Sequence, residues 1–262
     1  MPRLSQSSYT VVFAAVVCVV CAVLVAGAAV ALRDRQAVNV EIDRQKNVLM
    51  AAGEMRTDEV LSPAEVADRF ASFAPVAVDL QTGKEDAAFV VAGYDQRKSL
   101  GSAQTSFAAP SGNLAQIMRL PNRAVVYKKV DAGGALDMLV LPIEGKGLWS
   151  TMYGFLALDA DLNTIRGLTF YQHGETPGLG GEVDNPRWKA LWPGRKAFND
   201  AGEPVIEVVR GRAGTVEQDP HRVDGLSGAT LTSRGVMHTV DFWLGDNGFG
   251  PYLKSLHTGG GQ

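Results

Sequence analysis

Residues 224–233 read DGLSGATLTS and stand directly before an amphipathic helical pattern that we expect from about Thr232 to Leu244. Small residues let a bulky molecule approach the backbone, and the unpaired N–H groups at a helix start attract an anion. A hydroxyl held there can contact a phosphate or be esterified by one. Ser, Thr, Asp and Gly are also the usual residues of helix caps, so this segment alone favours a structural cap as much as an anion site.

The N-terminal part contains 23 consecutive residues without a charge, Thr10–Leu32. This length crosses a hydrocarbon core of about 30 Å as a helix, whereas the apolar region of a signal peptide is usually about 7–15 residues. We therefore predict a transmembrane helix at 10–32, after a short tail at 1–9. Cleavage near Ala26-Gly27-Ala28 is the alternative.

The two cysteines, Cys18 and Cys21, both lie inside the apolar stretch. They supply only half of a four-ligand metal site, so we interpret them as small apolar residues. Basic residues near the ends of the stretch are more frequent on its C-terminal side, which by itself favours a cytoplasmic location for the rest of the chain. This count is weak evidence, because large domains are translocated despite such charges.

Composition limits the class of the remaining chain. Apolar residues make up 46%, which is enough for a core, and the net charge is -3 without a long block of either sign. A protein that binds nucleic acid normally presents a basic face, so we expect no nucleic-acid partner. No nucleotide P-loop, dinucleotide-binding glycine pattern, zinc-binding HExxH or GxSxG elbow is present, and we predict no catalytic residue and no metal ligand.

Periodicity predicts a helical stalk or linker at 33–60, with helix to about Ala52, and one domain at 61–258 before a flexible tail at 259–262. The pattern Ser62-Pro63-Ala64-Glu65 is a capping box that opens a helix through about Phe73. We expect a loop at 95–118 and short helices at 185–192 and 251–257. Strand patterns lie at 76–78, 87–91, 124–130, 136–143, 150–158, 165–172 and 205–209. Strands followed by helices predict an α+β fold.

Two further glycine-rich segments lie at the ends of predicted strands: GKGLWS at 145–150 and HGETPGLGGE at 173–182. Each has an ordinary structural interpretation, as a hairpin turn and as a Pro-Gly turn. Their apolar residues Leu148, Trp149 and Leu179 are also suited to covering a flat apolar ring. Together with residues 224–233, they have the properties of a site for a cofactor with a phosphate at one end.

These three segments together resemble the FMN-binding domain of membrane flavoproteins, and the whole chain resembles the C subunits of sodium-translocating NADH:quinone reductases. The resemblance implies that Thr230, the last residue of the flavinylation motif, carries FMN covalently through a phosphoester. It also implies which other residues form the flavin site: Asp224, Ser227, Gly228 and Ala229 in the motif, Glu175, Thr176, Gly178, Leu179 and Gly180 beside the ring, and Leu148, Trp149 and Ser150 in the same pocket.

The resemblance further implies the partners. A separate flavin transferase installs FMN from FAD, and the chain relays electrons from NADH toward quinone within a six-subunit complex that exports sodium. The family topology implies a single-pass protein of the bacterial inner membrane with its domain in the periplasm, against the count of basic residues. Two alternatives stay open: the related G subunit of the ion-translocating ferredoxin:NAD complex, and a membrane-anchored binding domain without a cofactor.

Overall fold

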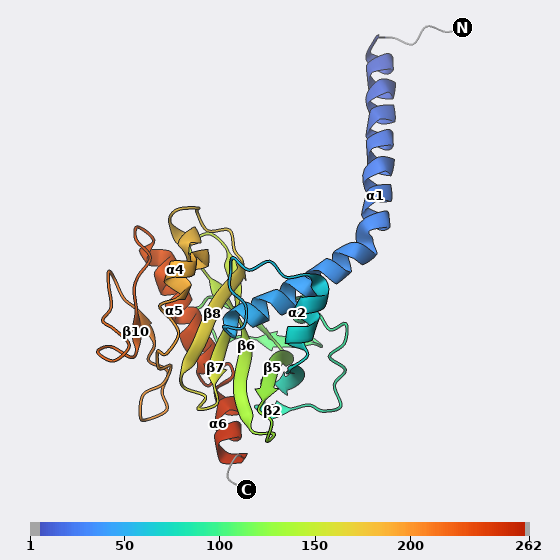
Figure 1. The fold of residues 1–262 in the computed structure, drawn as a ribbon. Helices are drawn as coiled ribbons and strands as arrows, with labels where there is room; N and C mark the ends of the chain where they lie inside the picture. The colour runs from blue at the N-terminus through green and yellow to red at the C-terminus, as the bar shows by residue number, and fades with distance from the viewer. Residues whose placement is uncertain (1–5, 260–262) are drawn as a thin grey trace. The chain divides into compact units, whose positions relative to one another are not determined.

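A computed structural model describes residues 6–259, which form two compact units divided between Arg44 and Gln45 (Figure 1). The first unit is the greater part of a single helix, α1 (Gln6–Ala51). Within the described residues, α1 is the one helix long and apolar enough to span a membrane, and its most apolar window has a mean hydropathy of 3.0. The expected N-terminal tail is already helical from Gln6; residues 1–5 and 260–262, including most of the expected C-terminal tail, lie outside the described range.

The last turns of α1 belong to the second unit. The helix ends at Ala51, close to the predicted end at Ala52, and Val48, Leu49 and Ala51 are fully buried. A Cβ on Gly167 would collide with the carbonyl oxygen of Ala51, so the end of α1 packs directly on a strand of the sheet. The compact unit therefore begins at Gln45, upstream of the boundary predicted at 61.

Helix α2 (Pro63–Phe70) begins at the predicted capping box. The Ser62 side chain accepts a hydrogen bond from the Glu65 amide, and the Glu65 carboxylate accepts one from the Ser62 amide. The helix ends at Phe70 rather than at Phe73, because Phe73 is already the first residue of a strand and pairs there with Lys129 of the neighbouring strand. The predicted end was therefore about one turn too late.

An antiparallel six-stranded sheet forms the centre of the second unit. Its spatial order is β2 (Lys84–Glu85), β1 (Phe73–Asp79), β5 (Arg123–Val130), β6 (Leu136–Lys146), β7 (Thr151–Asp159) and β8 (Ile165–Gln172). Strands β5 and β6 form a hairpin through a turn at Asp131–Gly134. The four strands predicted between 124 and 172 are therefore confirmed, and the α+β fold with them.

Three strand and loop predictions were wrong in part. Residues 87–91 form turns rather than a strand, because this apolar run has no partner strand, and Val90 is exposed. The expected loop at 95–118 contains α3 (Gln96–Ser99) and β3 (Ser106–Ala108), which pairs with β4 (Arg119–Pro121). Of the strand expected at 205–209, only β9 (Glu207–Val208) forms, in parallel with β10 (Arg222–Val223).

The helices after β8 are η1 (Gly180–Asp184), α4 (Pro186–Lys189), α5 (Thr230–Leu244) and α6 (Gly250–Gly259). Helix α5 packs on β6, and the Trp243 indole donates a hydrogen bond to the Glu144 carbonyl at 2.7 Å. Two glycines permit this close approach: a Cβ on Gly145 would collide with Thr239, and one on Gly235 with the Lys146 carbonyl. As a result, the start of α5 lies beside the β6–β7 turn.

Candidate functional site

Helix α5 begins at Thr230, two residues before the predicted start. Its N-cap is Ala229, and no side chain caps the first turn, so the structural-cap interpretation of residues 224–233 is wrong. Gly228 adopts a φ of 71°, a left-handed conformation that favours glycine. Thr230 is exposed at a helix start whose N–H groups are available to an acceptor.

The four hydroxyls of the segment have different environments. The buried Thr232 hydroxyl donates to Glu175 Oε2 at 2.6 Å, and the buried Ser233 hydroxyl accepts from the Leu226 amide at 3.0 Å. Ser227 and Thr230 are both exposed. Only these last two hydroxyls are therefore accessible to a reagent without local unfolding.

Asp224 positions the segment from its upstream end. Its carboxylate accepts a hydrogen bond from the Ala213 amide at 2.9 Å, and its carbonyl accepts one from the Trp188 indole at 2.8 Å. The next amide, Gly225 N–H, donates to the Gly211 carbonyl. Asp224 therefore contributes by fixing the backbone that leads to Thr230.

Glu175 joins the three glycine-rich segments. Its carboxylate is 5% exposed and accepts from three successive amides, Leu148 at 3.1 Å, Trp149 at 2.9 Å and Ser150 at 3.2 Å, as well as from the Thr232 hydroxyl. The loop after β8 is thus tied both to the β6–β7 turn and to the first turn of α5. We call this set of hydrogen bonds the Glu175 clasp.

Two glycines make room for the clasp. A Cβ on Gly147 would lie 2.6 Å from Glu175 Oε1, and a Cβ on Gly180 would lie 2.5 Å from Thr232 Oγ1. The Ser150 hydroxyl adds a further link between the same loops, because it accepts from the Gly174 amide at 2.6 Å. Positions 147 and 180 therefore need glycine, because any side chain there would collide with the Glu175 carboxylate or its Thr232 partner.

Burial alone raises the pKa of the Glu175 carboxyl. The hydrogen bonds from Thr232 and the three backbone amides outweigh this effect, so the pKa lies below its ordinary value. Glu175 is therefore ionised at neutral pH, and both of its oxygens already accept hydrogen bonds. It is suited to organising the site and unsuited to delivering a proton.

An exposed apolar surface surrounds the clasp. Leu148, Trp149 and Leu179 are 41%, 66% and 45% exposed. A Cβ on Gly228 would lie 3.0 Å from Leu179 Cδ2, so Leu179 contacts the segment that leads to Thr230. Exposed apolar side chains of this kind can cover the apolar ring of FMN. The exposed Thr230 hydroxyl at the start of α5 is suited to holding the phosphate end.

Thr176 and Gly178 shape the loop that carries Leu179. The Thr176 carbonyl accepts from the Leu179 and Gly181 amides, and Gly178 has a φ of 76°. The structure thus joins Glu175 to Leu148, Trp149 and Ser150, and it places Leu179 against Gly228. Asp224 instead contacts Ala213 and Trp188. Sequence reasoning did not assign Thr232 a role, although the helical spacing with Val236 and Val240 places Thr232 on the buried face.

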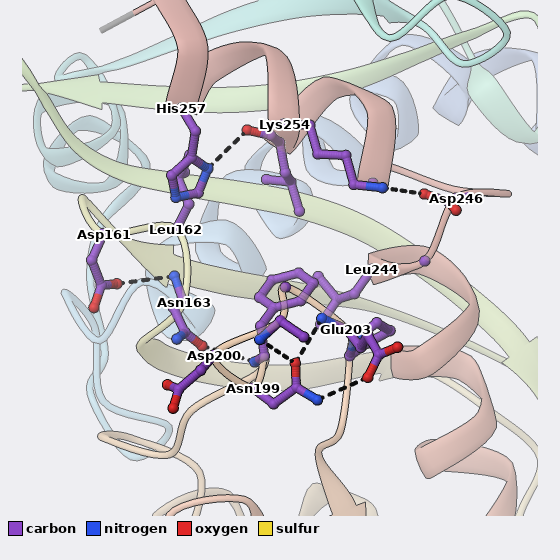
Figure 2. Close-up of a pocket in the computed structure, with 17 residues that line it drawn as sticks. Asp161, Leu162, Asn163, Asn199, Asp200, Glu203, Leu244, Asp246, Lys254 and His257 are labelled. Carbon is purple, nitrogen blue, oxygen red and sulfur yellow. Dashed lines mark hydrogen bonds and ion pairs between the residues drawn. The ribbon is translucent and has the colours of Figure 1, made fainter. Parts of the chain in front are cut away.

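A separate cavity lies away from the clasp. Its volume is about 610 Å³, and it lies between residues 161–163, residues 198–204 and the C-terminal helix α6 (Figure 2). Around it, Lys254 pairs with Asp246, and Asn199 donates to Glu203. None of the predicted site residues lines this cavity. Within residues 6–259, no cluster of three His, Cys, Asp or Glu side chains is arranged to hold a metal ion.

Comparison with known proteins identifies an FMN-binding domain in this chain. Residues 147–245 match the family described as FMN-binding domain, and this range includes both loops of the clasp and α5. The chain is 45% identical to the C subunit of the Na(+)-translocating NADH-quinone reductase of Yersinia pestis, over 98% of this chain and 96% of that protein. It is also 45% identical to the C subunit of the reductase of the same name from Pseudomonas aeruginosa, over 99% of both chains.

Solved structures give the same result. The crystal structure of Shewanella oneidensis NqrC aligns with a TM-score of 0.74 and 40% identity, covering 82% of this chain and 97% of that one. The C subunit of the Na(+)-translocating NADH-quinone reductase of Parabacteroides distasonis aligns with a TM-score of 0.63 and 25% identity, covering 85% of this chain and 96% of that one. The fold is therefore shared over more than four fifths of this chain.

The clasp makes a first prediction. Replacing Thr232 with Val removes one donor from a buried carboxylate, and we expect a loss of about 1–3 kcal/mol in the free energy of unfolding. Amide hydrogen exchange at residues 148–150 should accelerate at the same time. The matched control is Thr239→Val, because the buried Thr239 hydroxyl donates only to the Gly235 carbonyl of its own helix. Unchanged exchange at 148–150 in Thr232→Val would contradict the clasp.

The lowered pKa of Glu175 predicts a response to acid. A carboxylate with a depressed pKa stabilises the fold fully above its ordinary pKa of 4.5, and this contribution is lost as the pH falls through the lower folded-state pKa. Between pH 6 and pH 3, the wild type should therefore lose more unfolding free energy than Glu175→Gln, which cannot titrate there. Chemical denaturation at both pH values measures this difference, and parallel pH profiles would count against the assignment.

Proposed function

Because this chain belongs to the family of Na(+)-translocating NADH-quinone reductase C subunits, we propose that it carries FMN bound covalently to Thr230 through a phosphoester. As a member of that family, it is an electron-transfer subunit of a multi-subunit oxidoreductase complex and contains an FMN-binding domain. The covalent linkage and its position at Thr230 go beyond what membership of the family shows. The observation that carries them is the exposed, uncapped Thr230 at the start of α5.

The choice of Thr230 is supported by the environments of its neighbours. Thr232 and Ser233 are buried and hydrogen-bonded, so esterifying either would break the contacts that hold the segment. Ser227 is exposed but lies before Gly228, outside the helix. A phosphate on Thr230 would face the first N–H groups of α5, and the helix dipole favours negative charge there.

The apolar side chains around the clasp supply the rest of the site. Bound FMN supplies reversible uptake of electrons, which no side chain here provides. Leu148, Trp149 and Leu179 would cover the ring, and the Glu175 clasp would hold their two loops at a fixed separation. Because Glu175 stays ionised, it would present a constant negative charge near the ring.

The partners follow from the same proposal. The chain would relay electrons from NADH oxidation toward quinone reduction coupled to sodium export, as one of six subunits. A separate flavin transferase would install FMN, as the resemblance to this family implies. Helix α1 would anchor the chain in the bacterial inner membrane, with the domain in the periplasm.

The two alternatives have less support. Curated relatives that match nearly the whole chain are named as C subunits, which favours the sodium-translocating quinone reductase over the related G subunit of the ferredoxin:NAD complex. The match of residues 147–245 to an FMN-binding domain argues against a domain without a cofactor.

Covalent attachment is tested by substitution of the exposed hydroxyls. We expect the full chain, expressed with a flavin transferase, to give a fluorescent band on a denaturing gel under ultraviolet light. Thr230→Ala should abolish this band, whereas Ser227→Ala should retain it. Circular dichroism of both variants checks that the fold is intact. A fluorescent Thr230→Ala band would move the attachment to another hydroxyl, and a dark wild-type band would refute the covalent linkage.

The orientation is tested with protease added outside spheroplasts. We expect the domain to be cut in intact spheroplasts, because a periplasmic domain is accessible from that side. Immunoblotting against the C-terminal part measures the cleavage, and a cytoplasmic protein controls for lysis. Full protection of the domain would instead support the cytoplasmic location that the basic residues favour.

A further inference from the structure

Helix α5 presents a narrow exposed stripe at its start. Thr230, Leu231 and Arg234 are exposed, whereas Thr232, Ser233, Gly235 and Val236 are buried. Residues four apart on a helix are neighbours, with Cβ atoms about 5–6 Å apart, and long side chains lean toward the helix N-terminus. This geometry brings the Arg234 side chain within reach of the turn that begins at Thr230.

The backbone at Arg234 is held in place. The adjacent Gly235 packs against the Lys146 carbonyl, and its Cβ position lies 3.1 Å from the Gly147 Cα. The second turn of α5 is thereby fixed against the β6–β7 turn, which carries Leu148 and Trp149. Arg234 thus stands at the edge of the proposed flavin site, on a rigid element.

The charge of Arg234 has no ion-pair partner in the described part of the chain. Across residues 6–259, no Asp or Glu oxygen lies within 4.0 Å of its guanidinium, whereas Arg222 pairs with Glu207 at 3.0 Å and Arg123 pairs with Asp79 and Asp86. Arg210 and Arg212 are likewise exposed and, in the described chain, without an ion pair. They flank Gly211, whose carbonyl accepts a hydrogen bond from Gly225 in the segment that leads to Thr230.

We propose that Arg234 binds the phosphate group of the flavin nucleotide at Thr230. A guanidinium can donate two parallel hydrogen bonds to phosphate oxygens, and a phosphodiester on Thr230 retains one negative charge. Arg210 and Arg212 lie next to Gly211, which is hydrogen-bonded to Gly225, and they add positive charge near the upstream end of the segment. This inference rests on the proposed function, because it assumes that the flavin phosphate lies at Thr230.

If Arg234 contacts the phosphate, its loss should weaken the binding of FMN but not of a flavin without a phosphate. A purely structural role would affect both ligands. Riboflavin has the ring and side chain of FMN but no phosphate, so it probes the ring pocket without the anion. The full chain, solubilised in detergent and prepared without a flavin transferase, is titrated with FMN and separately with riboflavin. Quenching of flavin fluorescence reports both dissociation constants.

We expect Arg234→Gln to weaken FMN binding about threefold to tenfold and to leave riboflavin binding unchanged, because exposed charged contacts have this strength. Arg234→Lys should retain part of the preference for FMN. Added salt should reduce the preference of the wild type. The matched control is Arg222→Gln, because Arg222 is exposed but paired with Glu207, and it should bind both ligands as the wild type does.

An unchanged FMN-to-riboflavin affinity ratio in Arg234→Gln would overturn the inference, and so would a wild type that binds neither ligand or both equally. Mass spectrometry of the wild type expressed with the transferase separates this result from the proposed function. A chain without covalent FMN that still prefers FMN through Arg234 would refute the linkage and keep the phosphate contact. A wild type with FMN on Thr230, together with an unchanged FMN-to-riboflavin ratio in Arg234→Gln, would support the linkage and refute the phosphate contact.

Discussion

A buried carboxylate that accepts four hydrogen bonds organises the functional end of this protein. Glu175 takes three of its donors from successive amides of one loop and the fourth from a helix hydroxyl. Each of these donors would be left unsatisfied if the carboxylate were removed, and an unsatisfied buried group costs about 1–3 kcal/mol. Two loops and a helix therefore have one favourable relative arrangement. The glycines at 147 and 180 follow from it, because a side chain at either position would occupy the place of the clasp.

The packing of α5 on β6 provides the second condition. Close contact at Gly145 and Gly235 brings the helix near enough for the Thr232 hydroxyl to reach Glu175. The same helix then presents Thr230 outward without a side-chain cap. An uncapped first turn is a weakness in a structural helix and an asset in an anion site, because its N–H groups are left for a ligand.

Local patterns predicted the elements well where the sequence itself determined them. Uninterrupted apolar composition indicated α1, local strand patterns indicated the strands from 124 to 172, and the capping box marked the start of α2. The apolar run at 87–91 failed as a strand because strand formation depends on a partner, which a local pattern does not reveal. The clasp was out of reach for the same reason: Glu175 and Thr232 are 57 residues apart. Even the choice of Thr230 came from resemblance, because four nearby hydroxyls looked alike until the structure separated buried from exposed.

The buried end of α1 has a practical consequence for the domain as a separate object. Val48 and Leu49 lie in the hydrophobic interior of the second unit, although they belong to the same helix as the apolar stretch at 10–32. A soluble fragment that starts at 61, the boundary predicted from the sequence, would lack these side chains. The apolar surface that they cover would then be exposed to water. A fragment that begins before Gln45 would include these two side chains and therefore a complete hydrophobic interior. The anchor and the domain therefore share one continuous helix, and the part of it that the domain needs cannot be recognised from hydropathy.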